Sequence, residues 1–214
     1  MVSKMTQRIT PLNLGLQHTE WQVLKRLNTP KRIQDFLNTL PFDFAPGDEI
    51  DRSVQGTLRA GKIDCAGGAI LAAAALWAHG HKPLLLDLQV AQPDFDHVVA
   101  LFKEGNKWGA LSKTNHAVLR YREPVYASVR ELAMSYFHEY FLPNGSKTLR
   151  GFSKPFDLSK YGTGWFTDSE LILDIIYDLD YSAHTEIVSA KEAKRLRKAD
   201  PIEIKAGEMT EDNF

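Results

Sequence analysis

The chain has 214 residues, of which 43% are hydrophobic and 25% are charged, and its formal net charge is −1. Such a chain can bury one sizeable core, and its near-neutral charge excludes a global basic field that would bind nucleic acid or an anionic membrane. One cysteine cannot form an internal disulfide, which excludes an oxidised secreted scaffold, and the polar segment 1–17 does not read as a signal peptide. The longest small apolar run, 66–78, is too short to span a bilayer, so we expect a cytoplasmic protein.

The N-terminal segment 1–28 carries little pattern, and the first predicted element is the helix that follows it. Thr29 is the expected N-cap and Pro30 the first helical residue. Pro41 ends this helix, and residues 41–62, which hold several glycines and prolines, predict an irregular loop. A loop of this length is uncommon without a function. The apolar residues that recur on one face of the helix are Ile33, Phe36, Leu37 and Leu40.

A helix of unusually small residues is predicted from Cys65 to about His79. Asp64 is its expected N-cap, and Gly80 follows its end. Alanine and glycine occupy every face of this helix, so we expect it to be buried with strands packed closely against it.

Strands are predicted through the middle of the chain. Residues 84–90 read as one strand, and residues 97–103 and 107–111 read as a hairpin around a short Glu-Gly-Asn turn. Residues 117–121 are expected to add a further strand.

The second half of the chain predicts mainly helices. Residues 129–141 read as an aromatic-rich helix, and residues 143–164 as a loop region. Capping boxes at 167–170 and 189–192 are expected to open two more helices, 171–179 and a short basic one to about 199. We therefore expect a single domain over 29–200, with its core at about 60–120 and helical additions after 125. The tail, 201–214, is expected to be flexible.

Cys65 occupies a position that suits a nucleophile. At the first residue of a helix, unpaired backbone N–H groups and the helix dipole favour negative charge. This setting lowers the pKa of a thiol, and the same N–H groups can hold a developing oxyanion. The alternative is that Cys65 is a small buried hydrophobe in an alanine-rich helix.

His97 is the expected base for that thiol. It opens a strand after a polar turn, and a strand end at the rim of a sheet can present a side chain to the start of a packed helix. The alternative is a surface histidine at the end of a loop.

The order of these motifs resembles the transglutaminase-like branch of the papain-like cysteine enzymes. Cys65, the pair Asp96-His97 and the run Trp108-Gly109-Ala110-Leu111 match that family in type and order over roughly residues 60 to 115. The resemblance implies an α+β fold in which the nucleophile starts a central helix packed on an antiparallel sheet, to which the sequence pattern adds further helices towards the C-terminus. It also implies acyl transfer through a Cys–His pair.

The chain departs from the family at the third member of the triad. Ser112 stands where the family has Asp, and a serine hydroxyl can hydrogen-bond the histidine but brings no charge. Asn115 is a second candidate for this role, because papain-type enzymes use Asn there. Gln55 is a candidate oxyanion donor, although ten residues separate it from Cys65.

These observations predict a cysteine hydrolase that acts on a peptide, protein or small amide substrate as a peptidase, amidase or deamidase. A non-catalytic binding module that retains the fold and a crosslinking transglutaminase are the alternatives. No cofactor is expected, and no metal, because His79 and His81 have no cysteine or carboxylate at ligand spacing. No nucleic-acid or membrane partner is expected, since the basic run 191–198 reads as a solvated helix face. The oligomeric state is left open.

Overall fold

The computed structural model describes residues 14–45 and 52–211 and has the expected α+β architecture. Seven strands form one sheet in the order β4-β3-β2-β1-β5-β7, with β6 also paired to β1. Every pairing between these strands is antiparallel. The bounds of the strands are β1 Leu84–Val90, β2 His97–Glu104, β3 Lys107–Leu111, β4 Arg122–Tyr126, β5 Leu149–Ser153, β6 Phe156–Asp157 and β7 His184–Glu186.

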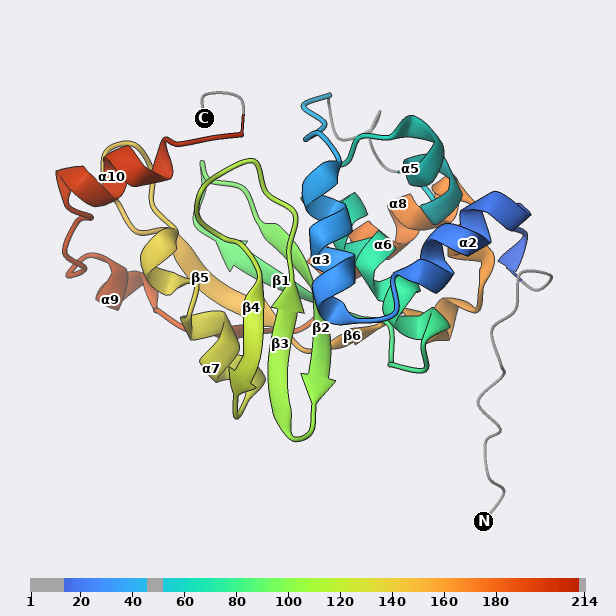
Figure 1. Ribbon diagram of the computed structural model, residues 1–214. Helices are drawn as coiled ribbons and strands as arrows, with labels where there is room; N and C mark the ends of the chain where they lie inside the picture. The colour runs from blue at the N-terminus through green and yellow to red at the C-terminus, as the bar shows by residue number, and fades with distance from the viewer. Residues whose placement is uncertain (1–13, 46–51, 212–214) are drawn as a thin grey trace, which may run out of the picture.

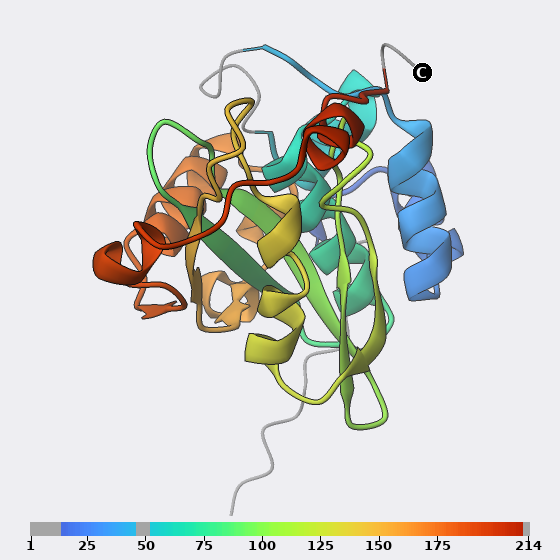
Figure 2. The ribbon, with the colours of Figure 1, turned by 90° about the vertical axis from the view of Figure 1, so that its left-hand side faces the viewer.

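Eight α-helices within the described ranges surround the sheet (Figures 1 and 2). One buried cluster lies between the sheet and α2, α3, α5, α6 and α8, and a second lies between its other face and α7. None of the helices in these ranges is long and apolar enough to cross a bilayer. Their bounds are α2 His18–Arg26, α3 Pro30–Thr39, α5 Val54–Ala60, α6 Cys65–Ala78, α7 Val129–Met134, α8 Ser169–Asp180, α9 Ala190–Ala193 and α10 Pro201–Gly207.

The central helix α6 confirms the prediction from its sequence. The carboxylate of Asp64 accepts a hydrogen bond of 2.7 Å from the N–H of Gly67, which caps the helix. Small residues let α6 lie directly on β2 and β1. At Gly68 a Cβ atom would come within 2.5 Å of the Cβ of Lys113, so only glycine fits there without displacing the chain that follows β3.

The strand β1 and the hairpin of β2 and β3 are also as predicted, but the strand expected at 117–121 is wrong. The fourth strand, β4, begins instead at Arg122. Leu119 has a left-handed backbone with φ of 60°. Its N–H donates to the carboxylate of Glu139 at 2.7 Å rather than to a neighbouring strand. Extended pairing is therefore interrupted at this residue.

Three helices were not expected from the sequence. The segment 1–28 contains α2, and the predicted loop 41–62 contains α5, whose N-cap Ser53 accepts from the N–H of Gly56. Residues 46–51 of that loop lie outside the described residues. The segment 201–214, expected as a flexible tail, contains α10, which begins with a proline and a capping box.

The helix predicted at 129–141 is shorter than its aromatic pattern suggested. The helix α7 ends at Met134, and a short 3-10 turn, η1 (Phe137–Glu139), follows. Tyr136 and Phe137 pack into the buried cluster on the α7 side of the sheet, and the hydroxyl of Tyr136 donates to the carbonyl of Arg120. Tertiary packing therefore outweighs the helical preference of this stretch.

The remaining predictions for the second half are partly correct. The region 143–164, expected as a loop, holds β5 and β6. The helix α8 is present, but its N-cap is Asp168, one residue after the position that the capping box indicated. The capping box of Ser189 and Glu192 is confirmed, although α9 ends at Ala193 rather than near 199.

Candidate active site

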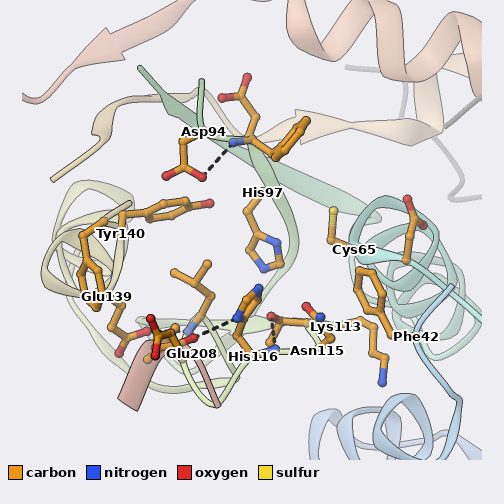
Figure 3. Close-up of a pocket in the computed structure, with 18 of the residues that line it drawn as sticks. Phe42, Cys65, Asp94, His97, Lys113, Asn115, His116, Glu139, Tyr140 and Glu208 are labelled. Atoms are coloured by element: carbon orange, nitrogen blue, oxygen red, sulfur yellow. Dashed lines mark hydrogen bonds between the residues drawn. The ribbon is translucent and has the colours of Figure 1, made fainter. Parts of the chain in front are cut away.

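A cavity of about 720 Å³ lies where α6 and β2 begin, and Figure 3 shows part of its lining. Its walls come from the start of α6, the turn before β2, residues 113–119, residues 139–143 and one side of α10. Cys65, His97 and Asn115 all line this cavity, so the structure brings together three of the side chains selected from the sequence.

The thiol of Cys65 lies at the first residue of α6, beside backbone N–H groups. Hydrogen bonds from the N–H groups of Val98 and Ala66 favour the thiolate. Burial and the nearby carboxylate of Asp64 act more strongly in the opposite direction and raise the pKa of the Cys65 thiol to about 12. The helix start alone predicted a lowered pKa; here desolvation outweighs it, so the resting group is a neutral thiol.

The imidazole of His97 is 5% exposed and is fixed through its Nε2 atom, which lies 2.8 Å from Oγ of Ser112. The hydroxyl of Ser112 donates in turn to the carbonyl oxygen of Leu119 at 2.5 Å. A carbonyl can only accept, so the hydroxyl proton belongs to this second bond and Nε2 must donate to Ser112. Nδ1 of His97 is therefore left with a lone pair.

His97 is neutral at ordinary pH. Burial lowers the pKa of its imidazole to about 4, and the charges of His116 and Arg122 act in the same direction. The carbonyl of Leu119 opposes this shift but does not overcome it. The imidazole of His97 contacts Ser112 and Leu119, whereas the thiol of Cys65 contacts backbone N–H groups. Both side chains face the same cavity (Figure 3).

Ser112 is held by a side chain from a distant helix. The amide of Gln34 on α3 donates to the carbonyl of Ser112 at 2.8 Å and accepts from its N–H at 3.0 Å. Gln34 thus supplies the two hydrogen bonds that a neighbouring strand would give. Both residues are buried, so the position of Ser112 behind His97 depends on this contact.

Asn115 lies in a segment, residues 113–116, that is hydrogen-bonded to residues 207–211 near the C-terminus. Its carbonyl accepts from the N–H of Glu211 at 2.7 Å, and the carboxylate of Glu211 binds the buried ammonium of Lys113 at 2.9 Å. Nδ1 of His116 lies 3.0 Å from the carbonyl of Gly207. Asn115 therefore faces the cavity, whereas Ser112 is the residue that contacts His97.

Gln55 is not brought to the cavity. Its amide donates to the carboxylate of Glu20 at 2.8 Å and approaches the carbonyl of Gly15 at 3.5 Å. It is engaged on α5 and does not line the cavity. The donors beside Cys65 are backbone N–H groups, those of Cys65 and Ala66 at the start of α6 and that of Val98 in β2.

Sequence reasoning missed three residues of the site. Gln34 and Leu119 position Ser112, and Tyr140 presents a buried hydroxyl that has no hydrogen-bond partner within the described part of the chain. Neither a buried glutamine on a helix nor a leucine with positive φ has a local sequence signature. Tyr140 sits in the aromatic stretch that was predicted as part of a helix over 129–141, and nothing in that pattern indicates a hydroxyl facing a cavity.

Across residues 14–45 and 52–211, no group of three or more histidine, cysteine, aspartate or glutamate side chains is placed to hold a metal ion. No protein-family model matches the sequence. No curated protein matches it either.

Proposed function

We propose that the protein is a cysteine-dependent acyl-transfer enzyme that hydrolyses an amide bond, with Cys65 as nucleophile and His97 as base. One observation carries this proposal. Ser112, bonded to Leu119, fixes the ring proton of His97 on Nε2, which leaves Nδ1 able to accept a proton in the cavity that Cys65 lines.

The surrounding fold supports a papain-like core of the transglutaminase-like type. The nucleophile starts a buried helix, α6, that packs on an antiparallel sheet, and the histidine starts the adjacent strand β2. The residue after β3 contacts the histidine, which is the place where that family carries its third triad member. Here that member is Ser112, a neutral hydroxyl.

The reaction follows from these positions. Nδ1 of His97 takes the thiol proton while the sulfur of Cys65 attacks the carbonyl carbon, and the carbonyl electron pair moves to the oxygen. The oxyanion then collapses, the C–N bond breaks, and the imidazolium gives its proton to the leaving amine. Water, deprotonated by His97, cleaves the thioester; a carboxylic acid is released and the thiol is restored.

The start of α6 is suited to hold the oxyanion. The N–H of Gly67 binds the carboxylate of Asp64 and the N–H of Gly68 binds its carbonyl. The N–H groups of Cys65 and Ala66 precede these and point towards the sulfur. Donors of this kind, aimed at developing charge, contribute ~3–4 kcal/mol of transition-state stabilisation in acyl transfer.

The resting pair is a neutral thiol and a neutral imidazole, because burial raises the pKa of Cys65 and lowers that of His97. Proton transfer must therefore accompany attack rather than precede it. The same neutrality is the observation that favours the alternative function, a non-catalytic module that binds a ligand in this cavity.

The proposal is tested with p-nitrophenyl acetate as an activated neutral substrate. We expect steady release of p-nitrophenolate by the wild-type protein and an acetylated Cys65 peptide by mass spectrometry. Cys65→Ser and His97→Ala should each lower the rate by ~100-fold or more, since each removes one of the reacting groups. Ser159→Ala, at an exposed serine outside the cavity, is the matched control and should leave the rate unchanged.

Folded protein that releases no p-nitrophenolate above the rate of the Cys65→Ser variant would favour the binding module. A rate that persists in His97→Ala would exclude the assigned base.

A further inference from the structure

Most of the charged side chains that line the cavity around Cys65 are acidic. Lys113 is the lining residue with a permanent positive charge among those the structure describes, and its ammonium is bound by Glu211. Six carboxylate side chains line the same cavity: Asp43, Asp64, Asp94, Asp96, Glu139 and Glu208.

Two of these carboxylates are already neutralised by cations. Asp43 is paired with Arg52 at 2.8 Å and with Lys62 at 3.0 Å. Glu139 is paired with Arg122 at 2.6 Å. Their charges are therefore largely compensated within the protein.

Asp94 and Asp96, in the turn before β2, are bound differently. Asp94 accepts from the hydroxyl of Thr148 at 2.5 Å and from the N–H of Phe95 at 2.9 Å. Asp96 accepts from the N–H of Val90 at 2.7 Å. Neutral donors orient these two carboxylates without cancelling their charge. Burial raises the pKa of Asp96, and the charge of His184 opposes this rise. Together the two carboxylates leave a negative field on this side of the cavity.

Tyr140 provides a second, independent sign of a ligand at the same place. Its side chain is 3% exposed, and its hydroxyl has no hydrogen-bond partner within the described residues. Figure 3 shows this hydroxyl directed into the cavity, beside Asp94 and towards His97. Buried hydroxyl groups are normally hydrogen-bonded, so this one has capacity for a group that enters the cavity.

We propose that the substrate of Cys65 carries an ammonium or guanidinium group, which binds among Asp94, Asp96 and the hydroxyl of Tyr140. This inference rests on the proposed function, because it names the substrate class of the same site. A cation of this kind donates several N–H groups, which match two carboxylates and a phenolic oxygen. Phe95, 84% exposed at the rim, adds an aromatic face that attracts cations.

A bound cation would also lower the pKa of the Cys65 thiol. The carboxylate of Asp64 opposes ionisation of Cys65, and Asp94 and Asp96 line the same cavity. A positive charge placed there stabilises the thiolate and so lowers the thiol pKa. The correct substrate would thus assist its own attack, whereas an anionic one would be repelled.

The test uses the fact that Cys65 is the single cysteine in the chain. Three methanethiosulfonate reagents, carrying an ethylammonium, an ethylsulfonate or an uncharged methyl group, are reacted with the folded protein and with the protein unfolded in urea. We expect the ratio of the ammonium rate to the sulfonate rate to be on the order of tenfold higher in the folded protein, the size that a cleft of one charge sign produces.

Asp94→Asn and Asp96→Asn keep an oxygen for the neutral donors and remove only charge. Each should lower the ratio, and the double variant should bring it close to the value in urea. Tyr140→Phe should lower it less, since it removes no charge. Asp35→Asn, at an exposed residue of α3 outside the cavity, is the matched control and should leave the ratio unchanged.

Equal ratios in folded and unfolded protein would overturn the inference, and so would a ratio that falls as much in Asp35→Asn as in Asp94→Asn. Either result would leave the proposed function standing if p-nitrophenyl acetate is still cleaved. A folded protein whose thiol reacts with none of the three reagents and which also cleaves no p-nitrophenyl acetate would overturn both, because the cavity would then admit no ligand to Cys65.

Discussion

The contact between Gln34 and Ser112 gives the sharpest stability prediction. Gln34→Leu replaces the amide with an apolar side chain of similar size, which leaves both the N–H and the carbonyl of Ser112 without their partner. Ser112 is 2% exposed, so water cannot readily replace the lost bonds. An unsatisfied buried polar group costs ~1–3 kcal/mol, so two of them predict a loss of ~2–6 kcal/mol in the free energy of unfolding.

Urea unfolding followed by circular dichroism measures this loss. Asn38→Ala is the control, because Asn38 accepts a hydrogen bond of 2.9 Å from the same Gln34 amide but lies towards solvent. Its expected cost is ~1 kcal/mol or less, the size of one ordinary hydrogen bond. A Gln34→Leu variant no less stable than Asn38→Ala would refute the reasoning that Gln34 holds Ser112 in place.

Three further perturbations test the packing and charge around the site. Gly68→Ala gains helix propensity but puts a Cβ 2.5 Å from that of Lys113, so we expect a net loss of up to ~2 kcal/mol in the free energy of unfolding and slower ester cleavage. Gly56→Ala in α5 is the control: the nearest atom to its Cβ is 3.1 Å away, so this change should be neutral or stabilising. Glu211→Gln removes the anion from the buried ammonium of Lys113 and should cost ~1–3 kcal/mol in urea unfolding. His97 has a folded pKa of about 4 against an ordinary 6.5, so the unfolded chain binds more protons between these values, and stability should fall by ~3 kcal/mol as pH drops from 6.5 to 4. His97→Gln should not show this loss of stability when urea unfolding midpoints are compared at pH 6.5 and pH 4. An equal change of midpoint with pH in both proteins would contradict a buried neutral imidazole.

Local signals in the sequence were sufficient to place Cys65 at the start of a helix and His97 at the start of a strand. Asp64 has the side chain that an N-cap requires, the residues after it are small enough to be buried on every face, and the start of α6 follows at Cys65. The hairpin that begins at His97 was equally clear, because apolar strands flank a short turn that contains Gly105. Helix caps and hairpin turns depend on neighbouring residues, which is why a single sequence reveals them.

The contacts that hold His97 and Ser112 in place join distant residues and could not be predicted in the same way. Gln34 reaches Ser112 across 78 positions of the chain. Leu119 takes a left-handed backbone that leucine disfavours, because Glu139 and Ser112 hold its N–H and its carbonyl. Strained backbone of this kind is imposed by tertiary structure and leaves no pattern in the sequence.

The thiol pKa shows the same limit in energetic terms. A cysteine at a helix start predicts a thiol with a lowered pKa. Whether the pKa of Cys65 rises or falls depends on its burial and on the distance to Asp64, neither of which can be read from the sequence. The position of Cys65 was therefore predictable, and its resting protonation state was not.

We have assigned His97 as the base that deprotonates Cys65 through Nδ1, and the pH dependence of acylation is the first measurement to make. Single-turnover acetylation of Cys65 by p-nitrophenyl acetate is followed by mass spectrometry for the wild-type protein and for His97→Ala. We expect a wild-type rate that is constant near neutral pH and falls only as the pH approaches 4, where His97 gains a proton. We expect the rate in the variant to be lower by ~100-fold or more. Identical rates and pH profiles in the two proteins would contradict the account, because the thiol would then react without the histidine.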